Sequence, residues 1–201
     1  MPKHRRHFGR QIASTRPLLL PQFGEMDDYR QRIEGIWKEL GAPPRPDRHI
    51  FAEATELVSV GMDIQGREQR LTPPAAGAWT NMKTAAEKSG EILQLVSAFR
   101  SVDYQKQIIQ RKLAAGQSWE QTLRVSALPG CSEHHTGRTI DVTTPGSKPL
   151  EEAFEGTSAF RWLSQHAREF GFTMTYPRGN PFGIAYEPWH WTWQGEADRM
   201  P

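Results

Sequence analysis

The most constraining feature of this sequence is a pair of short segments, far apart in the chain, that carry metal-ligand residues. The first contains His134 and Asp141, seven positions apart, with Gly137 between them. The second contains Glu187 and His190, three positions apart. Two histidines and one aspartate form a plausible three-ligand set for a catalytic zinc ion, which leaves one coordination position for water or substrate. The glutamate is then available beside that position as a general base, so we predict that the two segments meet in the fold.

Length and composition place this chain among globular proteins. Its 201 residues suffice for one compact domain with a core, or for one domain and an extension. Hydrophobic residues make up 37% of the chain and charged residues 24%, and the mean hydropathy is -0.66. The net charge is only +2, so composition does not favour a nucleic-acid partner. The basic residues near the start are typical of a solvated terminus: Lys3, Arg5, Arg6 and Arg10.

We find no sequence signal for export or membrane insertion. A secretory signal needs a continuous apolar stretch after the basic residues, but the only apolar run there is residues 18–20, between Pro17 and Pro21. No stretch approaches the roughly 18 apolar residues of a membrane-spanning helix. The single cysteine, Cys131, excludes an internal disulfide. The sequence as given is therefore not visibly exported, although a mature form could have lost its leader, and we expect no transmembrane segment.

Periodicity and capping signals predict a mixture of helices and short strands. The expected helices are one capped by Asp27 or Asp28 and ending before Gly41, then residues 72–90, 103–113 and 118–130, and a helix within 151–171. The expected strands are residues 57–64, 92–99, 138–143, 172–176 and 186–194. Helices that precede and separate short strands favour an α+β fold with a small antiparallel sheet flanked by helices. We expect residues 1–25 to form an extended arm.

The two metal-ligand segments and a third, upstream segment resemble the zinc D-alanyl-D-alanine carboxypeptidases of the VanY type. The first two follow the pattern Ser132-x-His134-x-x-Gly137-x-x-x-Asp141 and then Glu187-x-x-His190. Upstream, residues 97–105 read Ser-Ala-Phe-Arg-Ser-Val-Asp-Tyr-Gln, where the family has Ser-x-Phe/Tyr-Arg-Ser-x-x-x-Gln. The resemblance covers about residues 75–194. We therefore divide the chain into an N-terminal arm, helix and short strand of unknown role (residues 1–70) and a catalytic domain (residues 71–201).

The resemblance implies a role for each matching position. The implied zinc ligands are His134, Asp141 and His190, and the implied general base is Glu187. Arg100 is implied to bind the C-terminal carboxylate of a peptide, with Ser132 and Gln105 as supporting polar groups. The chemistry suits these residue types, because a planar guanidinium recognises a carboxylate through two parallel hydrogen bonds.

Each residue also has a structural interpretation without catalysis. Arg100 could pair with a surface acid, Asp141 could cap a loop, and Ser132 and Gln105 could serve only to order the chain. Cys131 has Cys-x-x-His spacing to the first histidine, but we expect a structural thiol. His135 would point away from its neighbour in an extended segment, so we expect it at the surface or behind the ligands.

The resemblance implies a zinc-dependent carboxypeptidase that removes the C-terminal D-Ala of peptidoglycan stem peptides. On the same scaffold, the alternatives are an L,D-carboxypeptidase, a D,D-dipeptidase and an endopeptidase of the phage-lysin kind. From another class, the domain could be a peptidoglycan-binding module in which zinc is only structural, although an intact Glu187 argues against this. The family implies a cell envelope or periplasmic location, while the lack of a visible signal leaves cytoplasmic residence and lysin-type release open.

Overall fold

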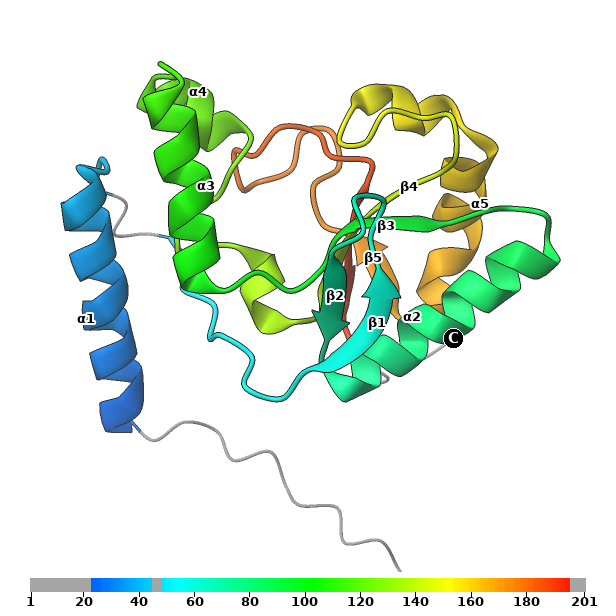
Figure 1. Cartoon of the computed structure of the whole chain (residues 1–201), viewed down its shortest axis with the longest axis horizontal. Helices are drawn as coiled ribbons and strands as arrows, with labels where there is room; N and C mark the ends of the chain where they lie inside the picture. The colour runs from blue at the N-terminus through cyan, green and yellow to red at the C-terminus, as the bar shows by residue number, and fades with distance from the viewer. Residues whose placement is uncertain (1–22, 45–47, 196–201) are drawn as a thin grey trace, which may run out of the picture.

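A four-stranded antiparallel sheet forms the centre of the structure (Figure 1). The computed structural model describes residues 23–44 and 48–195. The strand order is β3 (Gln94–Ser97), β4 (Thr139–Thr143), β6 (His190–Trp193) and β5 (Phe172–Met174). The two central strands, β4 and β6, therefore come from distant parts of the chain. A separate hairpin, β1 (Val58–Met62) and β2 (Glu68–Leu71), is joined to β3 because the amide of Ile64 donates to the carbonyl of Leu95 (3.0 Å).

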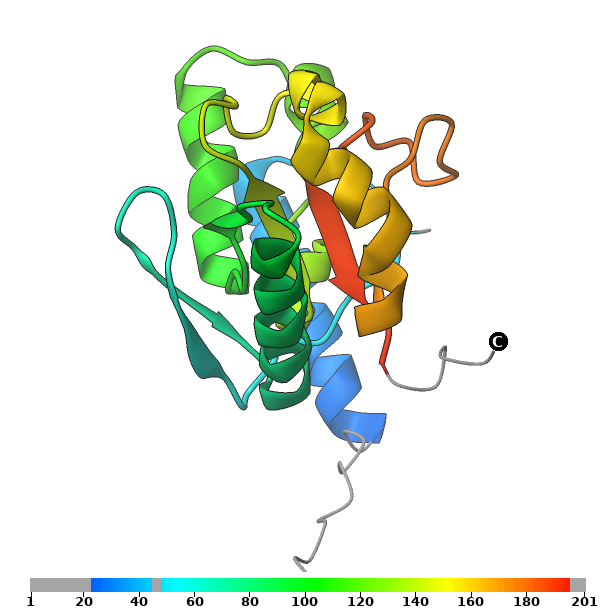
Figure 2. The ribbon, with the colours of Figure 1, turned by 90° about the vertical axis from the view of Figure 1, so that its right-hand side faces the viewer.

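Two helices, α2 (Pro73–Lys88) and α5 (Ser158–His166), pack on one side of this sheet (Figures 1 and 2). Strand β4 turns Ile140 and Val142 towards them, and both side chains are fully buried in the main core. The same core receives residues from both helices and from β6, among them Trp79, Met82, Leu163 and Trp191. The strand expected over residues 138–143 is therefore confirmed, and the polar residues of β4 are left for the opposite face.

Three helices lie on the other side of the molecule: α1 (Phe23–Leu40), α3 (Val102–Ala114) and α4 (Trp119–Arg124) (Figure 1). The first helix packs through an apolar face, because Ile33 and Ile36 are buried in a second cluster with Ile50 and Val102. The indole of Trp37 donates a hydrogen bond to the carbonyl of Pro129 (2.8 Å). Helix α1 is thus attached to the loop that leads into the His134 segment.

The α+β fold with small antiparallel sheets is confirmed, and several predicted boundaries are wrong. Helix α1 begins at Phe23, so Asp27 and Asp28 lie inside it rather than cap it. Helix α4 ends at Arg124 instead of continuing to residue 130, and β6 begins only at His190. Strand β2 was not predicted. The arm expected over residues 1–25 lies outside the described residues, apart from 23–25, which are helical.

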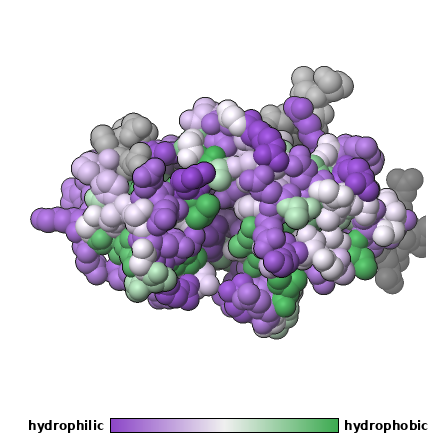
Figure 3. All heavy atoms as spheres, turned by 90° about the horizontal axis from the view of Figure 1, so that it is seen from above, coloured by the Kyte–Doolittle hydropathy of each residue, from purple (hydrophilic) through white to green (hydrophobic). Residues whose placement is uncertain are grey.

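None of the helices in the described part of the chain is long and apolar enough to cross a membrane. Seen from above, the surface is mostly hydrophilic and is hollowed near its middle (Figure 3).

Candidate active site

The register of the two central strands brings Asp141 and His190 together. The two residues are directly paired across β4 and β6, and both side chains project from the face opposite the α2 and α5 core. One carboxylate oxygen of Asp141, Oδ1, lies 3.0 Å from Nδ1 of His190. The two segments predicted to meet therefore do so through ordinary antiparallel pairing, which places opposed side chains close together.

His134 reaches the same carboxylate from a short 3-10 turn, Glu133–Thr136. Its Nδ1 lies 2.6 Å from the carbonyl of Ala98, which only accepts hydrogen bonds, so Nδ1 carries the proton. The other ring nitrogen, Nε2, is buried without a hydrogen-bond partner and lies 3.2 Å from Oδ2 of Asp141. The turn ends at Gly137, whose φ of +62° and crowded surroundings, with Leu57 Cδ2 2.9 Å from a would-be Cβ, require glycine.

These three side chains suit a zinc ion. One candidate ligand atom from each of His134, Asp141 and His190 lies within 4.8 Å of the others, and all three residues are buried. The bare Nε2 of His134 faces a carboxylate oxygen, an arrangement that is unfavourable unless a cation or proton lies between them. Two imidazole nitrogens and a carboxylate oxygen are the ligand types that zinc prefers.

The electrostatics of the set follow from its burial. Burial and the nearby Arg100 charge lower the pKa of His134 to about 4, so its ring is neutral at pH 7. Burial also opposes charge on Asp141, but the two histidines outweigh it and hold the pKa of the carboxyl well below its usual range. Burial likewise opposes charge on His190, yet its hydrogen bonds to Asp141 and Glu133 outweigh that effect and raise its pKa to about 9. At pH 7 the metal-free site therefore holds an anionic Asp141 between a neutral His134 and a protonated His190, and a bound cation would take the place of the His190 proton.

Glu187, the predicted general base, lies next to His190. Its Oε2 is 3.6 Å from Nδ1 of His190. The turn before β6 fixes this spacing, because the amide of His190 donates to the carbonyl of Glu187 (3.1 Å). Burial raises the pKa of the Glu187 carboxyl to about 7, and the Asp141 charge adds to the rise. A carboxyl group with such a pKa can both accept and release a proton near neutral pH.

Arg100 lies on the edge of the metal-ligand set. Its Nη2 is 3.8 Å from Oδ2 of Asp141, and its side chain remains 19% exposed. Its Nη1 donates to Oε1 of Gln105 (3.2 Å), and Gln105 in turn donates to the carbonyl of Ala127 (2.7 Å). Gln105 therefore orients the Arg100 side chain. That either residue contacts substrate stays a prediction. Ser132 is buried before the 3-10 turn and its hydroxyl forms no hydrogen bond to a described residue, so its role also stays a prediction.

Two residues that sequence reasoning missed surround His190. Glu133 accepts hydrogen bonds from His190 Nε2 (2.9 Å) and from the hydroxyl of Thr192 (2.9 Å). Because Nε2 is occupied in this way, Nδ1 is the nitrogen that His190 turns towards Asp141. The ring of Tyr176 lies against His190, with 4.5 Å between ring centroids. Glu133 neighbours a predicted ligand in the sequence, but nothing in the spacing indicated a partner 57 positions away.

The two weaker candidates are not among the ligands. His135 is fully buried, so of the two expected positions, at the surface or behind the ligands, the structure gives the second. Its Nδ1 lies 2.6 Å from the carbonyl of Arg100, and its Nε2 accepts from the amide of Gly130 (3.0 Å). It therefore ties the loop before His134 to the arginine segment. Cys131 lies apart from the ligand set and faces a neighbouring cavity, and burial raises the pKa of its thiol to about 11.

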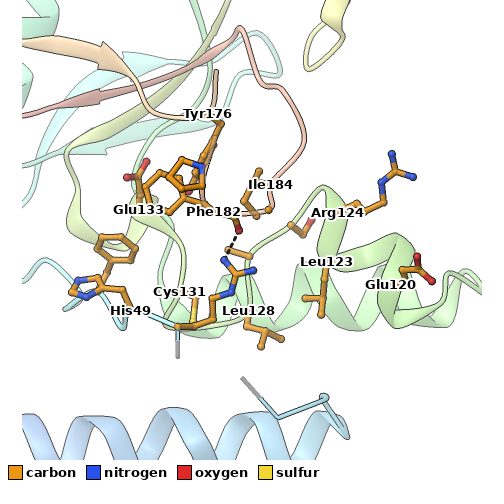
Figure 4. A pocket seen from close by; sticks show the side chains of 16 residues that line it. His49, Glu120, Leu123, Arg124, Leu128, Cys131, Glu133, Tyr176, Phe182 and Ile184 are labelled. Carbon is orange, nitrogen blue, oxygen red and sulfur yellow. Dashed lines mark hydrogen bonds between the residues drawn. The ribbon is translucent and has the colours of Figure 1, made fainter. Parts of the chain in front are cut away.

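That cavity has a volume of about 590 Å³, within the usual range for small-ligand sites (Figure 4). Glu133 and Tyr176, the residues that contact His190, line it. The cavity therefore adjoins the metal-ligand set.

Comparisons with known proteins point to one family. The VanY family, described as D-alanyl-D-alanine carboxypeptidase, matches residues 68–196. YodJ of Bacillus subtilis, provisionally named a carboxypeptidase, is 34% identical over 151 residues, which is 72% of this chain and 55% of that protein. The chain spans about half the length of the curated relatives it matches, with 55% and 43% for the first two.

Solved structures agree with this match. The LD-carboxypeptidase LdcB, whose structure describes peptidoglycan recognition, superposes with a TM-score of 0.64 and 31% identity over 73% of this chain and 72% of that one. A vancomycin-resistance D,D-pentapeptidase, VanY, solved in complex with Zn(II), superposes with a TM-score of 0.58 over 75% and 85% of the two chains. Its identity is 24%, so this second likeness concerns the fold alone.

Proposed function

The chain belongs to the VanY family of D-alanyl-D-alanine carboxypeptidases, and on that premise we propose that it is a zinc-dependent peptidase of peptidoglycan stem peptides. One observation carries the proposal. Two imidazole nitrogens and the Asp141 carboxylate converge in a buried site, and the Glu187 carboxylate lies next to them. A purely structural zinc site needs no such base, so this arrangement favours catalysis over a binding module.

The proposed ligands are His134, Asp141 and His190. A zinc ion held there supplies Lewis acidity, which polarises a scissile carbonyl and lowers the pKa of water. The chain's own residues supply the proton transfers. Glu187 takes a proton from the attacking water on its carboxylate and passes it to the leaving amine, a role that its raised pKa of about 7 supports.

Arg100 is proposed to bind the terminal carboxylate of the substrate. Gln105 holds Nη1, while Nη2 and the partial exposure of the side chain leave donors for a ligand. A free terminal carboxylate is what distinguishes the substrate of a carboxypeptidase from that of an endopeptidase, so this arginine favours exopeptidase activity. We propose removal of a C-terminal D-Ala from the D-Ala-D-Ala end of a pentapeptide.

A second candidate is an L,D-carboxypeptidase that acts on the tetrapeptide stem. Its support is the likeness to LdcB, which has the higher identity and TM-score of the two solved structures described above. Either activity would be exercised where peptidoglycan lies, so we propose the cell envelope as the place of action.

Mass spectrometry of two synthetic stems tests these proposals. A pentapeptide ending in D-Ala-D-Ala and a tetrapeptide ending in one D-Ala are incubated with zinc-loaded protein, with and without a chelator. Chelator-sensitive loss of one alanine from the pentapeptide supports the D,D-carboxypeptidase, and loss from the tetrapeptide supports the L,D-enzyme. Loss of two residues would indicate a dipeptidase, and an internal cut an endopeptidase. Binding without cleavage of either peptide would overturn catalysis and favour the binding module.

A further inference from the structure

The cavity beside the metal-ligand set is built partly by residues that precede the family match. Arg48, His49 and Phe51 line it together with the 181–184 loop and helix α4 (Figure 4). The family match begins only at residue 68. The N-terminal extension, defined here as residues 23–67, therefore contributes a wall to the candidate substrate cleft.

This wall is fixed to the loop that carries the metal ligand. The amide of Phe51 donates to the carbonyl of Gly130 (2.8 Å), and the amide of Ala54 donates to the carbonyl of His135 (2.8 Å). Glu53 accepts a hydrogen bond from the amide of Val102 at the start of α3 (2.7 Å). These bonds hold the segment after Arg48 at a set position relative to His134.

Cationic side chains on the cavity wall have unused donors. Arg48 donates from Nη1 to the carbonyl of Phe182, and neither Arg48 nor Arg124 forms an ion pair with a described residue. Of the two acids that line the cavity, Glu133 is already bound to His190 and Thr192, which leaves Glu120. A guanidinium has five N–H donors, so Arg48 retains several for a ligand.

The course of a bound peptide connects this cavity to the reaction. If the terminal carboxylate binds Arg100 and the scissile bond lies at the ligand set, the upstream residues must leave by another path. Arg100 does not line the cavity, whereas Glu133 and Tyr176, which contact His190, do. The cavity is therefore a path of suitable size for the residues that precede the scissile bond.

We propose that this cavity is a subsite for an upstream carboxylate of the stem peptide, and that Arg48 recognises it. The inference rests on the proposed function. Stem peptides carry such groups on the γ-linked glutamate, and on diaminopimelate where that residue replaces lysine; amidation removes the charge. A guanidinium binds a carboxylate through charge-assisted, often bidentate hydrogen bonds, and an amide cannot replace the charge.

Paired substrates test the subsite. The catalytic efficiency, kcat/KM, is measured on stems with a free and an amidated glutamate carboxylate, each with lysine or diaminopimelate at the third position. We expect the natural protein to prefer one free carboxylate by about tenfold, mainly through KM, as one hydrogen bond to a charged group would give. The pair of stems that shows the preference identifies which carboxylate binds.

Variants separate recognition from folding. Arg48→Ala should abolish the preference, and Arg48→Lys should keep part of it. Arg161→Ala is the matched control, because Arg161 also donates to a backbone carbonyl, that of Gly156 (3.1 Å), but does not line the cavity. A merely structural effect of losing the Phe182 contact would slow all substrates equally. The same free-to-amidated ratio in natural protein and Arg48→Ala would overturn the proposal.

A binding experiment distinguishes failure of the subsite from failure of the proposed function. Calorimetric titration with the stem tripeptide requires no cleavage. Tighter binding of the free-carboxylate tripeptide that depends on Arg48 would support the subsite even if no peptide is hydrolysed. Equal affinity of natural protein and Arg48→Ala for the free and amidated tripeptides would overturn it, whatever the activity.

Discussion

The metal-ligand set and the wall beside it are built from different kinds of contact. The ligands are buried side chains fixed by strand register and by hydrogen bonds on their ring nitrogens. The wall, residues 48–57, has no helix or strand, and backbone hydrogen bonds and apolar contacts attach it to its neighbours. Asp141 and His190 thus lie on paired strands and His134 on a short turn next to them, whereas the segment that we propose to contact substrate is irregular, as binding segments commonly are.

The largest expected effect tests whether catalysis depends on the residues around the metal-ligand set. Glu187→Gln removes the proposed proton acceptor but no proposed ligand. We expect kcat to fall by about 10²–10⁴-fold, the usual contribution of a general base, with zinc content unchanged by elemental analysis. Glu152→Gln, which removes an exposed acid outside the cavity, is the control and should stay near the natural rate. Near-normal turnover of Glu187→Gln would contradict the mechanism.

A second variant asks whether the extension and the metal site unfold together. Ile33 is fully buried, and its methyl group Cγ2 is 2.7 Å from where a Cβ at Gly130 would stand. Ile33→Ala should reduce the free energy of unfolding by about 2–5 kcal/mol, measured by chemical denaturation. If the N-terminal extension and the metal-ligand set are separable, the zinc affinity of Ile33→Ala changes less than twofold. Ile92→Ala, at a half-exposed position, is the control and should change neither the free energy of unfolding nor the zinc affinity. A tenfold loss of zinc affinity would show one cooperative unit.

A smaller effect is expected from Glu133, which contacts the candidate ligand His190. Glu133→Gln removes the charge that fixes His190 through Nε2. We expect zinc affinity to fall by about 10–100-fold, as for other carboxylates that support a ligating histidine, measured by competition with a chromogenic chelator. Thr192→Val should cost less, because it removes only a donor to that carboxylate. Unchanged affinity in Glu133→Gln, equal to that of the exposed control Glu152→Gln, would show that Glu133 does not orient the ring.

The two regions also differ in how far the sequence predicted them. The convergence of His134, Asp141 and His190 was predicted from the residue types and spacing of two segments, and the resemblance implied the same three positions. The contact of Glu133 with His190 was not predicted, because its partners lie on the distant strand β6. The cavity was not predicted either, because it depends on where residues 48–51 meet the 181–184 loop. Contacts between segments so far apart in the sequence leave no local sequence pattern.

The misplaced elements have physical reasons of the same kind. Strand β2 was missed because its sequence is mostly polar. Its buried residue Gln69 donates to Asp63 and accepts from the amide of Ala98. Helix α4 stops early where the carbonyl of Arg124 accepts from the amide of Ala185. In each case a tertiary hydrogen bond decided what local propensity could not.

The smallest predicted effect concerns the outer attachment of the extension. Lys106 on α3 contacts both carboxylate oxygens of Glu39 on α1 at 2.7 Å, but the Glu39 side chain is 61% exposed. Solvent screens such a pair, so a double-mutant cycle with Glu39→Gln and Lys106→Met should give a coupling energy of about 0.2–1 kcal/mol. Denaturation at low and high salt provides the check, because only a charge interaction weakens as salt rises. A coupling well above this range would mean that helix α1 is held by electrostatics as much as by the buried Ile33 contact.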